Sequence, residues 1–293
     1  MKIRVRCSLS ALCRIIWVLF VFLSCDGSNK DYYEIIPETG LLKAKAIGII
    51  GDSISSFSGS LPSDKKGYDG VFYKSFYPRG DVREIGDMWW AKVAADLGID
   101  IGSVANCSWS GSTVTGDASS WSSAFAGCSW RRIQDLSFLG DSPSLILCFI
   151  SCNDWAGNKE IGSWPTNKTI PPTEIQPLSV TDSYALMLYR IIQRYPKAHV
   201  ACLTNLEDAK RDAAPGSPSN NGKGITVEEW NRNIAMIAEA LGCEVIDLHG
   251  CGITYDNVND YTIDEGLHPN KSGMIMIANK VVEEILGMIN DLS

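Results

Sequence analysis

Five short and largely apolar runs are spaced along the chain from residue 46 onward, and each has the length of a β-strand. They lie at residues 46–50, 101–105, 145–150, 200–203 and 244–248. A continuous apolar run of this length, bounded by glycine or polar residues, is typical of a strand that is buried on both faces. We therefore predict about five parallel strands inside an α/β domain.

Between these runs lie segments in which apolar residues recur at three- and four-residue spacing, as they do in amphipathic helices. Gly98 and Gly242 directly follow two of these segments, at positions where helices commonly end. Alternating strands and helices with right-handed crossovers predict a three-layer αβα sandwich that binds ligands at the carboxyl ends of its strands. The predicted helices cover residues 88–97, 130–138, 181–195, 227–241 and 272–289.

The N-terminus has the features of an export signal. Four basic residues precede an apolar run at residues 15–23, which is too short to span a bilayer comfortably. This run leads to Cys25 and a polar stretch, as in the processing site of a bacterial lipoprotein. We expect residues 1–24 to be a lipoprotein-type signal peptide, Cys25 to carry the lipid, residues 25–45 to form a tether and residues 46–293 to form one domain. An ordinary signal-peptidase site or an uncleaved anchor is the alternative, and in each case the domain is exported.

The net charge of the chain limits the classes of molecule that it is expected to bind. Without the signal peptide, 22 Lys and Arg residues stand against 34 Asp and Glu residues, a formal net charge of −12. Such a surface disfavours nucleic acid and anionic lipid as partners. We expect a small-molecule or glycan ester as the partner, and a lipid anchor as the only attachment to the membrane.

The cysteines do not indicate a metal site. Seven of the ten cysteines follow Cys25, and their spacing matches no zinc pattern. Cys148 and Cys202 lie inside predicted strands, where cysteine usually acts as a small buried hydrophobe. An odd number leaves at least one thiol free, and the sequence assigns no disulfide.

Ser53 is the candidate nucleophile. Gly51-Asp52-Ser53 directly follows the first predicted strand, so Ser53 is expected at the ligand-binding edge of the sheet. The N-terminus of a helix that follows such a turn stabilises negative charge. The same triplet is also common in turns and helix caps, so further residues are needed to support a catalytic role.

A serine nucleophile needs an adjacent base, and the chain contains three histidines. His199 immediately precedes the fourth predicted strand, which places it at the opposite edge of the sheet. His249 follows the fifth strand and lies at the correct edge. His268 has Asp264 and Glu265 shortly before it, and a carboxylate that orients an imidazole and stabilises its charged form favours His268 as the base.

Four short motifs, taken in their order along the chain, resemble the sequence blocks of the SGNH or GDSL family of hydrolases. The first family block is Gly-Asp-Ser, here residues 51–53, and the last is Asp-x-x-His-Pro, here Glu-Gly-Leu-His-Pro at residues 265–269. The second block corresponds to Asn-Cys-Ser-Trp-Ser-Gly at residues 106–111, and the third, Gly-x-Asn-Asp, to Ser-Cys-Asn-Asp at residues 151–154. Further motifs resemble family members from gut-type Bacteroidetes: Phe76-Tyr77-Pro78, Gly80-Asp81-Val82, Trp89-Trp90 and Ser108-Trp109-Ser110-Gly111-Ser112.

The resemblance implies a flavodoxin-like SGNH hydrolase fold and a serine esterase that uses neither a metal nor an organic cofactor. Ser53 would attack an ester carbonyl while His268 accepts its proton. The oxyanion would be held by the backbone N–H groups of Ser53 and Gly111 and by the side-chain amide of Asn153.

The chain departs from the family pattern at two positions. Ser151 replaces the glycine of the third block, and Glu265 replaces the aspartate three residues before His268. A glutamate can orient an imidazole, and Asp264 takes that role if the loop shifts by one residue. These departures motivate an alternative, a catalytically weak glycan-binding surface lipoprotein.

The substrate is the least specified part of the prediction. Family analogy suits removal of short acyl groups, including O-acetyl groups on carbohydrates, while a lipid esterase and an acyltransferase on the same fold stay open. Aromatic residues crowd the connection after the nucleophile, where they either line a cleft that stacks sugar rings or pack as the core of a loop. They are Phe57, Tyr68, Phe72, Tyr73, Phe76, Tyr77, Trp89 and Trp90.

Overall fold

The computed structural model describes residues 45–117, 122–164, 179–207, 220–264 and 266–291. The predicted signal peptide, Cys25 and nearly all of the predicted tether lie outside these residues, as does Glu265. In the described part of the chain, no helix is both long and apolar enough to cross a bilayer.

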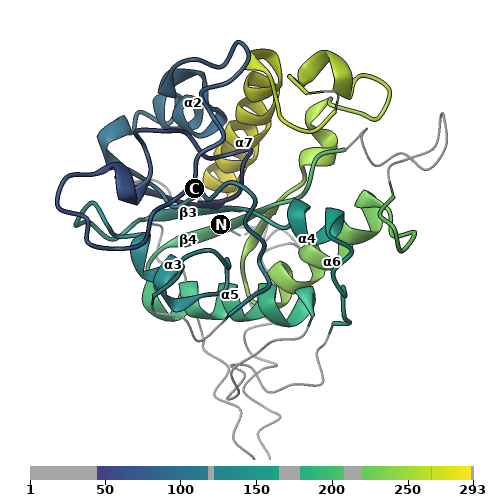
Figure 1. Cartoon of the computed structure of the whole chain (residues 1–293), viewed down its shortest axis with the longest axis horizontal. Coiled ribbons are helices and arrows are strands. Elements are labelled where there is room, and N and C mark those ends of the chain that lie inside the picture. The colour runs from purple at the N-terminus through teal and green to yellow at the C-terminus, as the bar shows by residue number, and fades with distance from the viewer. Residues whose placement is uncertain (1–44, 118–121, 165–178, 208–219, 265, 292–293) are drawn as a thin grey trace, which may run out of the picture. The chain divides into compact units, whose positions relative to one another are not determined.

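A five-stranded parallel sheet forms the middle layer (Figure 1). The strand order is β2-β1-β3-β4-β5, and every pair of neighbours is parallel, which confirms the predicted sheet. The strands are β1 (Ile47–Gly51), β2 (Val104–Asn106), β3 (Leu145–Phe149), β4 (His199–Leu203) and β5 (Glu244–Ile246).

Helices cover both faces of the sheet, so the predicted three-layer αβα sandwich is confirmed. Figure 1 shows α2 and α7 on one side of the sheet and α3, α5 and α6 on the other. The five predicted helices correspond to α2 (Trp89–Asp96), α3 (Trp130–Asp135), α5 (Val180–Arg194), α6 (Val227–Ala240) and α7 (Lys271–Asp291). A short helix that was not predicted, α4 (Cys152–Ala156), follows β3.

Continuous apolar runs mark the strands because alternate side chains enter two separate cores. Ile47 and Ile49 belong to the core beneath α2 and α7, whereas Ile50 belongs to the core beneath α3, α5 and α6. All three side chains are fully buried. Full burial of such a side chain contributes about 1.5–3 kcal/mol, so neither face tolerates a polar substitution.

Two predicted strands differ from the structure by more than one residue at one end, and side-chain caps explain both differences. Residues 101–103 form a 3-10 turn because the Asp100 carboxylate accepts the Gly102 N–H at 2.7 Å, so β2 starts only at Val104. Residues 248–251 form another 3-10 turn, which Asp247 caps, so β5 ends at Ile246. Local hydrogen bonds of this kind compete with strand pairing.

Candidate active site

Ser53, His268 and Asp264 form one hydrogen-bonded line. His268 Nε2 lies 2.8 Å from Ser53 Oγ, and His268 Nδ1 lies 2.5 Å from Asp264 Oδ2. Ser53 is 6% exposed and His268 is 8% exposed, so the pair is shielded from bulk water without being sealed off. This arrangement lets a base remove the serine proton while a carboxylate fixes the orientation of the imidazole. Glu265, the other carboxylate considered from the sequence, lies outside the described residues.

The loop before α7 places the carboxylate four residues before His268 rather than three. The Asp264 side chain accepts the backbone N–H of His268 at 2.8 Å, in addition to facing the ring. The Ile263 N–H donates to the His268 carbonyl at 2.9 Å, and Thr262 Oγ1 accepts the Gly266 N–H at 2.9 Å. The loop is therefore held closed at both ends, and Asp264 contacts both the backbone and the ring of His268.

Three neighbouring strands deliver the groups expected to hold an oxyanion. Ser53 follows β1, Gly111 follows β2 and Asn153 lies in α4 after β3, and these strands are adjacent in the sheet. Within the described residues, the backbone N–H groups of Ser53 and Gly111 donate to no protein acceptor. Asn153 Nδ2 donates one hydrogen bond, to the Ser112 carbonyl at 2.9 Å, and its second N–H has no acceptor in the described residues.

Two glycines of this region are required for different reasons. Gly111 has φ +82, in the left-handed region that favours glycine, although a side chain there would meet only open space. Gly51 has an ordinary backbone, but a Cβ atom would lie 2.7 Å from Ser108 Oγ and 2.7 Å from Ser55 Cβ. Gly51 thus lets the second block approach the first.

Ser151 occupies a backbone conformation that suits the glycine of the family pattern. Its φ is 128 and its ψ is −4, which costs a residue with a Cβ atom about 1–3 kcal/mol. The buried hydroxyl accepts the Trp230 Nε1–H at 3.1 Å and lies 3.3 Å from Asn205 Oδ1. These contacts offset the strain and tie the start of α4 to α6 and to the end of β4.

The aspartates of the first and third blocks hold the blocks together. Asp52 accepts the Cys152 thiol proton at 3.0 Å, and burial raises the pKa of Asp52. Asp154 accepts the Val114 N–H at 2.7 Å and both the N–H and the hydroxyl of Thr115, at 3.1 and 2.7 Å. Burial raises the pKa of Asp154 to about 6 against the effect of these bonds.

Arg132 is a buried neighbour of Ser53 that the sequence pattern did not single out. It lies in α3 and is 0% exposed, and its guanidinium donates to the carbonyls of Gly51 and Cys107 and to Ser112 Oγ. It therefore holds the ends of β1 and β2 together beside Ser53. The available signal was a charged residue on the apolar side of the predicted helix, next to the buried Ile133.

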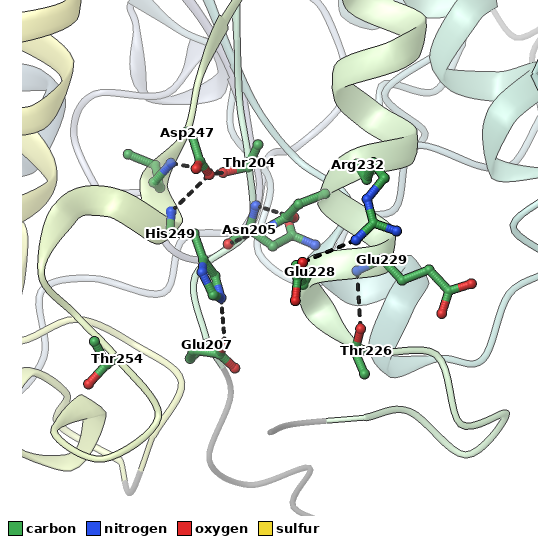
Figure 2. A network of polar contacts seen from close by, with 12 residues as sticks. Thr204, Asn205, Glu207, Thr226, Glu228, Glu229, Arg232, Asp247, His249 and Thr254 are labelled. Carbon is green, nitrogen blue, oxygen red and sulfur yellow. Dashed lines mark hydrogen bonds and ion pairs between the residues drawn. The ribbon is translucent and has the colours of Figure 1, made fainter. Parts of the chain in front are cut away.

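Within the described residues, neither of the other two histidines forms a hydrogen bond with Ser53. His249 Nε2 lies 2.5 Å from Glu207 Oε1 at the ends of β4 and β5 (Figure 2), and this hydrogen bond raises the pKa of His249. Asp247 accepts the His249 N–H at 3.1 Å and the Thr204 hydroxyl proton at 2.9 Å, which fixes the turn that carries His249. His199 starts β4 at the amino edge, as predicted, and burial lowers its pKa.

The aromatic residues in the connection after Ser53 mainly form a core rather than a cleft. Only Phe72 is strongly exposed, at 74%, while Tyr68 and Phe76 are partly buried. Trp109, in the second block, packs edge-on against Phe125 with ring centroids 5.7 Å apart, and Phe125 is 40% exposed. The remaining five are buried: Phe57, Tyr73, Tyr77, Trp89 and Trp90.

The thiols and carboxylates of the described region do not form a metal centre. All seven cysteines there are free thiols. Among the same residues, no group of three or more His, Cys, Asp or Glu side chains converges as metal ligands.

Comparison with known proteins shows the family. A family model described as GDSL-like lipase/acylhydrolase matches residues 45–215. No curated protein matches the chain.

Solved structures show the same fold. A protein described as a GDSL-like lipase from Bacteroides uniformis has 24% identity and a TM-score of 0.56, over 83% of this chain and 96% of its own. A protein described as a GDSL-like lipase from Bacteroides ovatus has 22% identity and a TM-score of 0.56, over 84% of this chain and 99% of its own. A protein from Lactobacillus plantarum has 17% identity and a TM-score of 0.57, over 83% of this chain and 97% of its own. With the family model matching more than half of its length, the chain belongs to the GDSL-like lipase/acylhydrolase family and is an ester hydrolase.

Proposed function

We propose that the chain is a serine esterase that cleaves acyl esters through an acyl-enzyme intermediate. The observation that supports this most strongly is the continuous contact from Ser53 Oγ through His268 to Asp264, at 2.8 and 2.5 Å. A binding protein that had lost catalysis would have no need of this alignment. The 2.8 Å contact therefore counts against the alternative of a catalytically weak glycan-binding protein.

The proposed reaction has two halves. Ser53 Oγ attacks the ester carbonyl carbon as its proton passes to His268 Nε2, and the oxyanion is held by the N–H groups of Ser53 and Gly111 and the amide of Asn153. The tetrahedral adduct then expels the alcohol, which takes the proton from His268. Water next attacks the acyl-enzyme while His268 accepts its proton, and the carboxylic acid leaves as Ser53 recovers its proton. Asp264 holds Nδ1–H and stabilises the imidazolium in both halves.

We propose short acyl groups, including the O-acetyl groups of carbohydrates, as the substrate class. Trp109 lies two residues before Gly111, and together with the half-exposed Phe125 it offers an aromatic surface beside an oxyanion donor. Aromatic faces stack on sugar rings and on other flat apolar groups. The acidic surface expected for the exported domain disfavours anionic lipid surfaces, which makes a lipid esterase the weaker choice.

The first test is hydrolysis of p-nitrophenyl acetate and butyrate by the full chain and by three variants. Ser53→Ala and His268→Ala are expected to lower kcat by about 10⁴-fold or more, because the nucleophile and its base act as a unit. His249→Ala is the matched control, and we expect it to stay within about twofold of the parent, with folding of all variants checked by circular dichroism. Equal activity in all four proteins would refute the serine mechanism. Acyl transfer from the same esters to an added sugar would identify an acyltransferase.

We also propose that the mature protein is a lipoprotein anchored to the cell envelope through Cys25. The supporting features are the four basic residues, the short apolar run and the polar stretch after Cys25. Cys25→Ser should move the protein from the membrane fraction to the soluble fraction and abolish palmitate labelling. Cys13→Ser, which leaves the processing site intact, is the control and should change neither.

A further inference from the structure

We propose that Phe76 and Tyr77 form a clasp that holds His268 against Ser53, and that Phe76 is a positioning residue for the catalytic base. The inference rests on the proposed function for its catalytic meaning. Its structural part, that the clasp fixes the His268 ring, can be tested separately.

One end of the clasp is fixed to the loop that follows Ser53. The Phe76 N–H donates to Ser56 Oγ at 2.9 Å, and the Tyr77 N–H donates to the Ser56 carbonyl at 3.1 Å. The Ser58 N–H in turn donates to the Tyr77 carbonyl at 2.9 Å. Three hydrogen bonds thus attach residues 76 and 77 to the segment that begins three residues after the nucleophile.

The other end of the clasp is fixed to the loop that carries His268. Tyr77 is 0% exposed, and its hydroxyl donates to the Pro269 carbonyl at 2.6 Å. Burial, with smaller contributions from Asp264 and Asp81, raises the pKa of Tyr77. The phenol therefore stays protonated and donates to the residue next to His268.

Phe76 covers one face of the His268 ring. The two ring centroids lie 3.6 Å apart and the planes are inclined by 12°. The His268 ring occupies one face of the Phe76 ring. The Arg79 guanidinium lies over the other face, 4.7 Å from the Phe76 centroid. Tyr77 packs edge-on against Phe76 at 4.9 Å and 81°, which fixes the phenyl ring itself.

The stack supplies a restraint that the in-plane hydrogen bonds of His268 lack. Nδ1 and Nε2 face Asp264 and Ser53, so these contacts restrain the ring within its plane, whereas Phe76 restrains its tilt out of that plane. The negative face of an aromatic ring also attracts the imidazolium that forms when His268 accepts the serine proton. Both effects act on the base and not on the substrate.

Kinetics of Phe76→Leu, Phe76→Tyr and the matched control Phe72→Leu test the catalytic part. Phe72 lies in the same connection, four residues before Phe76, but is 74% exposed, so its loss should leave activity unchanged. We expect Phe76→Leu to lower kcat by about 10- to 100-fold with KM within about twofold, equally for acetate and butyrate esters, because small misplacements of reacting groups cost up to about 100-fold. Phe76→Tyr should restore most of the loss. An unchanged kcat, or a rise in KM for one ester only, would overturn the proposal, the latter by placing Phe76 against the substrate.

A second measurement does not depend on hydrolysis. The His268 Nδ1–H beside Asp264 should give a far-downfield proton signal, which His268→Ala identifies by its loss. Phe76→Leu is expected to speed exchange of this proton with water, whereas Phe72→Leu should leave it unchanged, and the signal of the His249–Glu207 pair serves as an internal reference. Identical exchange in Phe76→Leu and the parent would refute the clasp even if the chain hydrolysed no ester. Faster exchange without Ser53-dependent hydrolysis would refute the proposed function and keep the clasp.

Discussion

Two histidine–carboxylate pairs lie at the carboxyl edge of the same sheet, and only one of them is proposed to be catalytic. The distance from ring nitrogen to carboxylate oxygen is 2.5 Å in both His268–Asp264 and His249–Glu207. In the first pair the His268 side chain is 10% exposed and its other nitrogen faces Ser53. In the second, the carboxylate is buried and the His249 side chain is 39% exposed. A short histidine–carboxylate contact is therefore no mark of catalysis by itself, and the neighbouring hydroxyl and covered ring make the difference.

Replacing the carboxylate of each pair should give the largest difference in kcat between the two pairs. Asp264→Asn is expected to lower kcat by about 10⁴-fold, since the amide favours the wrong tautomer of the imidazole. Glu207→Gln, the same change in the other pair, should leave kcat within about twofold. The measurement is kcat for p-nitrophenyl acetate, and a similar loss in both variants would mean that the two pairs are coupled.

Glu265→Gln sharpens the same comparison inside the active-site loop. Because Asp264 already contacts both the ring and the backbone N–H of His268, we expect the Glu265 variant to keep kcat within about threefold. Loss of activity in Glu265→Gln together with near-normal activity in Asp264→Asn would transfer the acid role to Glu265.

The oxyanion amide should have the next largest effect. Asn153→Ala is expected to lower kcat by about 10²–10³-fold, the usual cost of removing one oxyanion donor. KM should change little, because the amide acts mainly on the charge that develops in the transition state. Asn158→Gly, a nearby change that suits the local φ of 55, is the control and should retain parental kcat. A loss confined to KM would place Asn153 in ground-state binding instead.

The sheet could be predicted from the sequence because each strand depends on a pattern of short range. Buried strands appear as apolar runs, and Ser53, Gly111 and Asn153 follow strands whose carboxyl ends meet at one edge of a parallel sheet. His268 lies 215 residues from Ser53 in the chain and was singled out by its neighbouring carboxylates instead. The choice between Asp264 and Glu265 depends on one residue of loop spacing, which the sequence alone does not specify. In the structure the Asp264 carboxylate contacts His268 Nδ1, and the Glu265→Gln variant tests the choice.

Other parts of the site carried no sequence signal of sufficient strength. The Arg132 contacts join α3 to the ends of β1 and β2, so its role arises from packing between distant segments. The stacking of Phe76 on His268 likewise joins residues far apart in the chain. An aromatic-rich loop alone could not distinguish Phe76 from Trp89 or Trp90, which the structure buries in the core.

Ser151 offers a smaller effect, measured on stability. At φ 128 an alanine keeps the backbone strain and loses the hydroxyl contacts, whereas a glycine loses the contacts but relieves the strain. We expect both Ser151→Ala and Ser151→Gly to unfold at lower urea concentration than the parent, with the glycine variant more stable than the alanine variant by about 1 kcal/mol. Equal stability of the two variants would show that Ser151 is not strained.

The smallest expected effect is the pH dependence of the His249–Glu207 pair. The hydrogen bond to Glu207 raises the pKa of His249 above its ordinary value of 6.5. The charged pair therefore contributes to the free energy of unfolding below pH 6.5, and this contribution is lost as pH rises through the raised pKa. The parent should therefore exceed His249→Gln in stability by more at pH 6 than at pH 9 in urea unfolding. His199→Gln should show the opposite trend, because burial lowers the pKa of His199. A difference between parent and His249→Gln that does not change with pH would contradict the pair as an ionic contact.

Covalent labelling with a serine-directed phosphonate, followed by mass spectrometry of the tryptic peptides, tests the proposed roles of Ser53 and His268 most directly. We expect one adduct per chain, on Ser53, in the parent and in His249→Ala, and none at the same exposure time in His268→Ala. An adduct on another residue, or labelling of Ser53 that is equally fast without His268, would contradict the assignment of Ser53 and His268 as nucleophile and base.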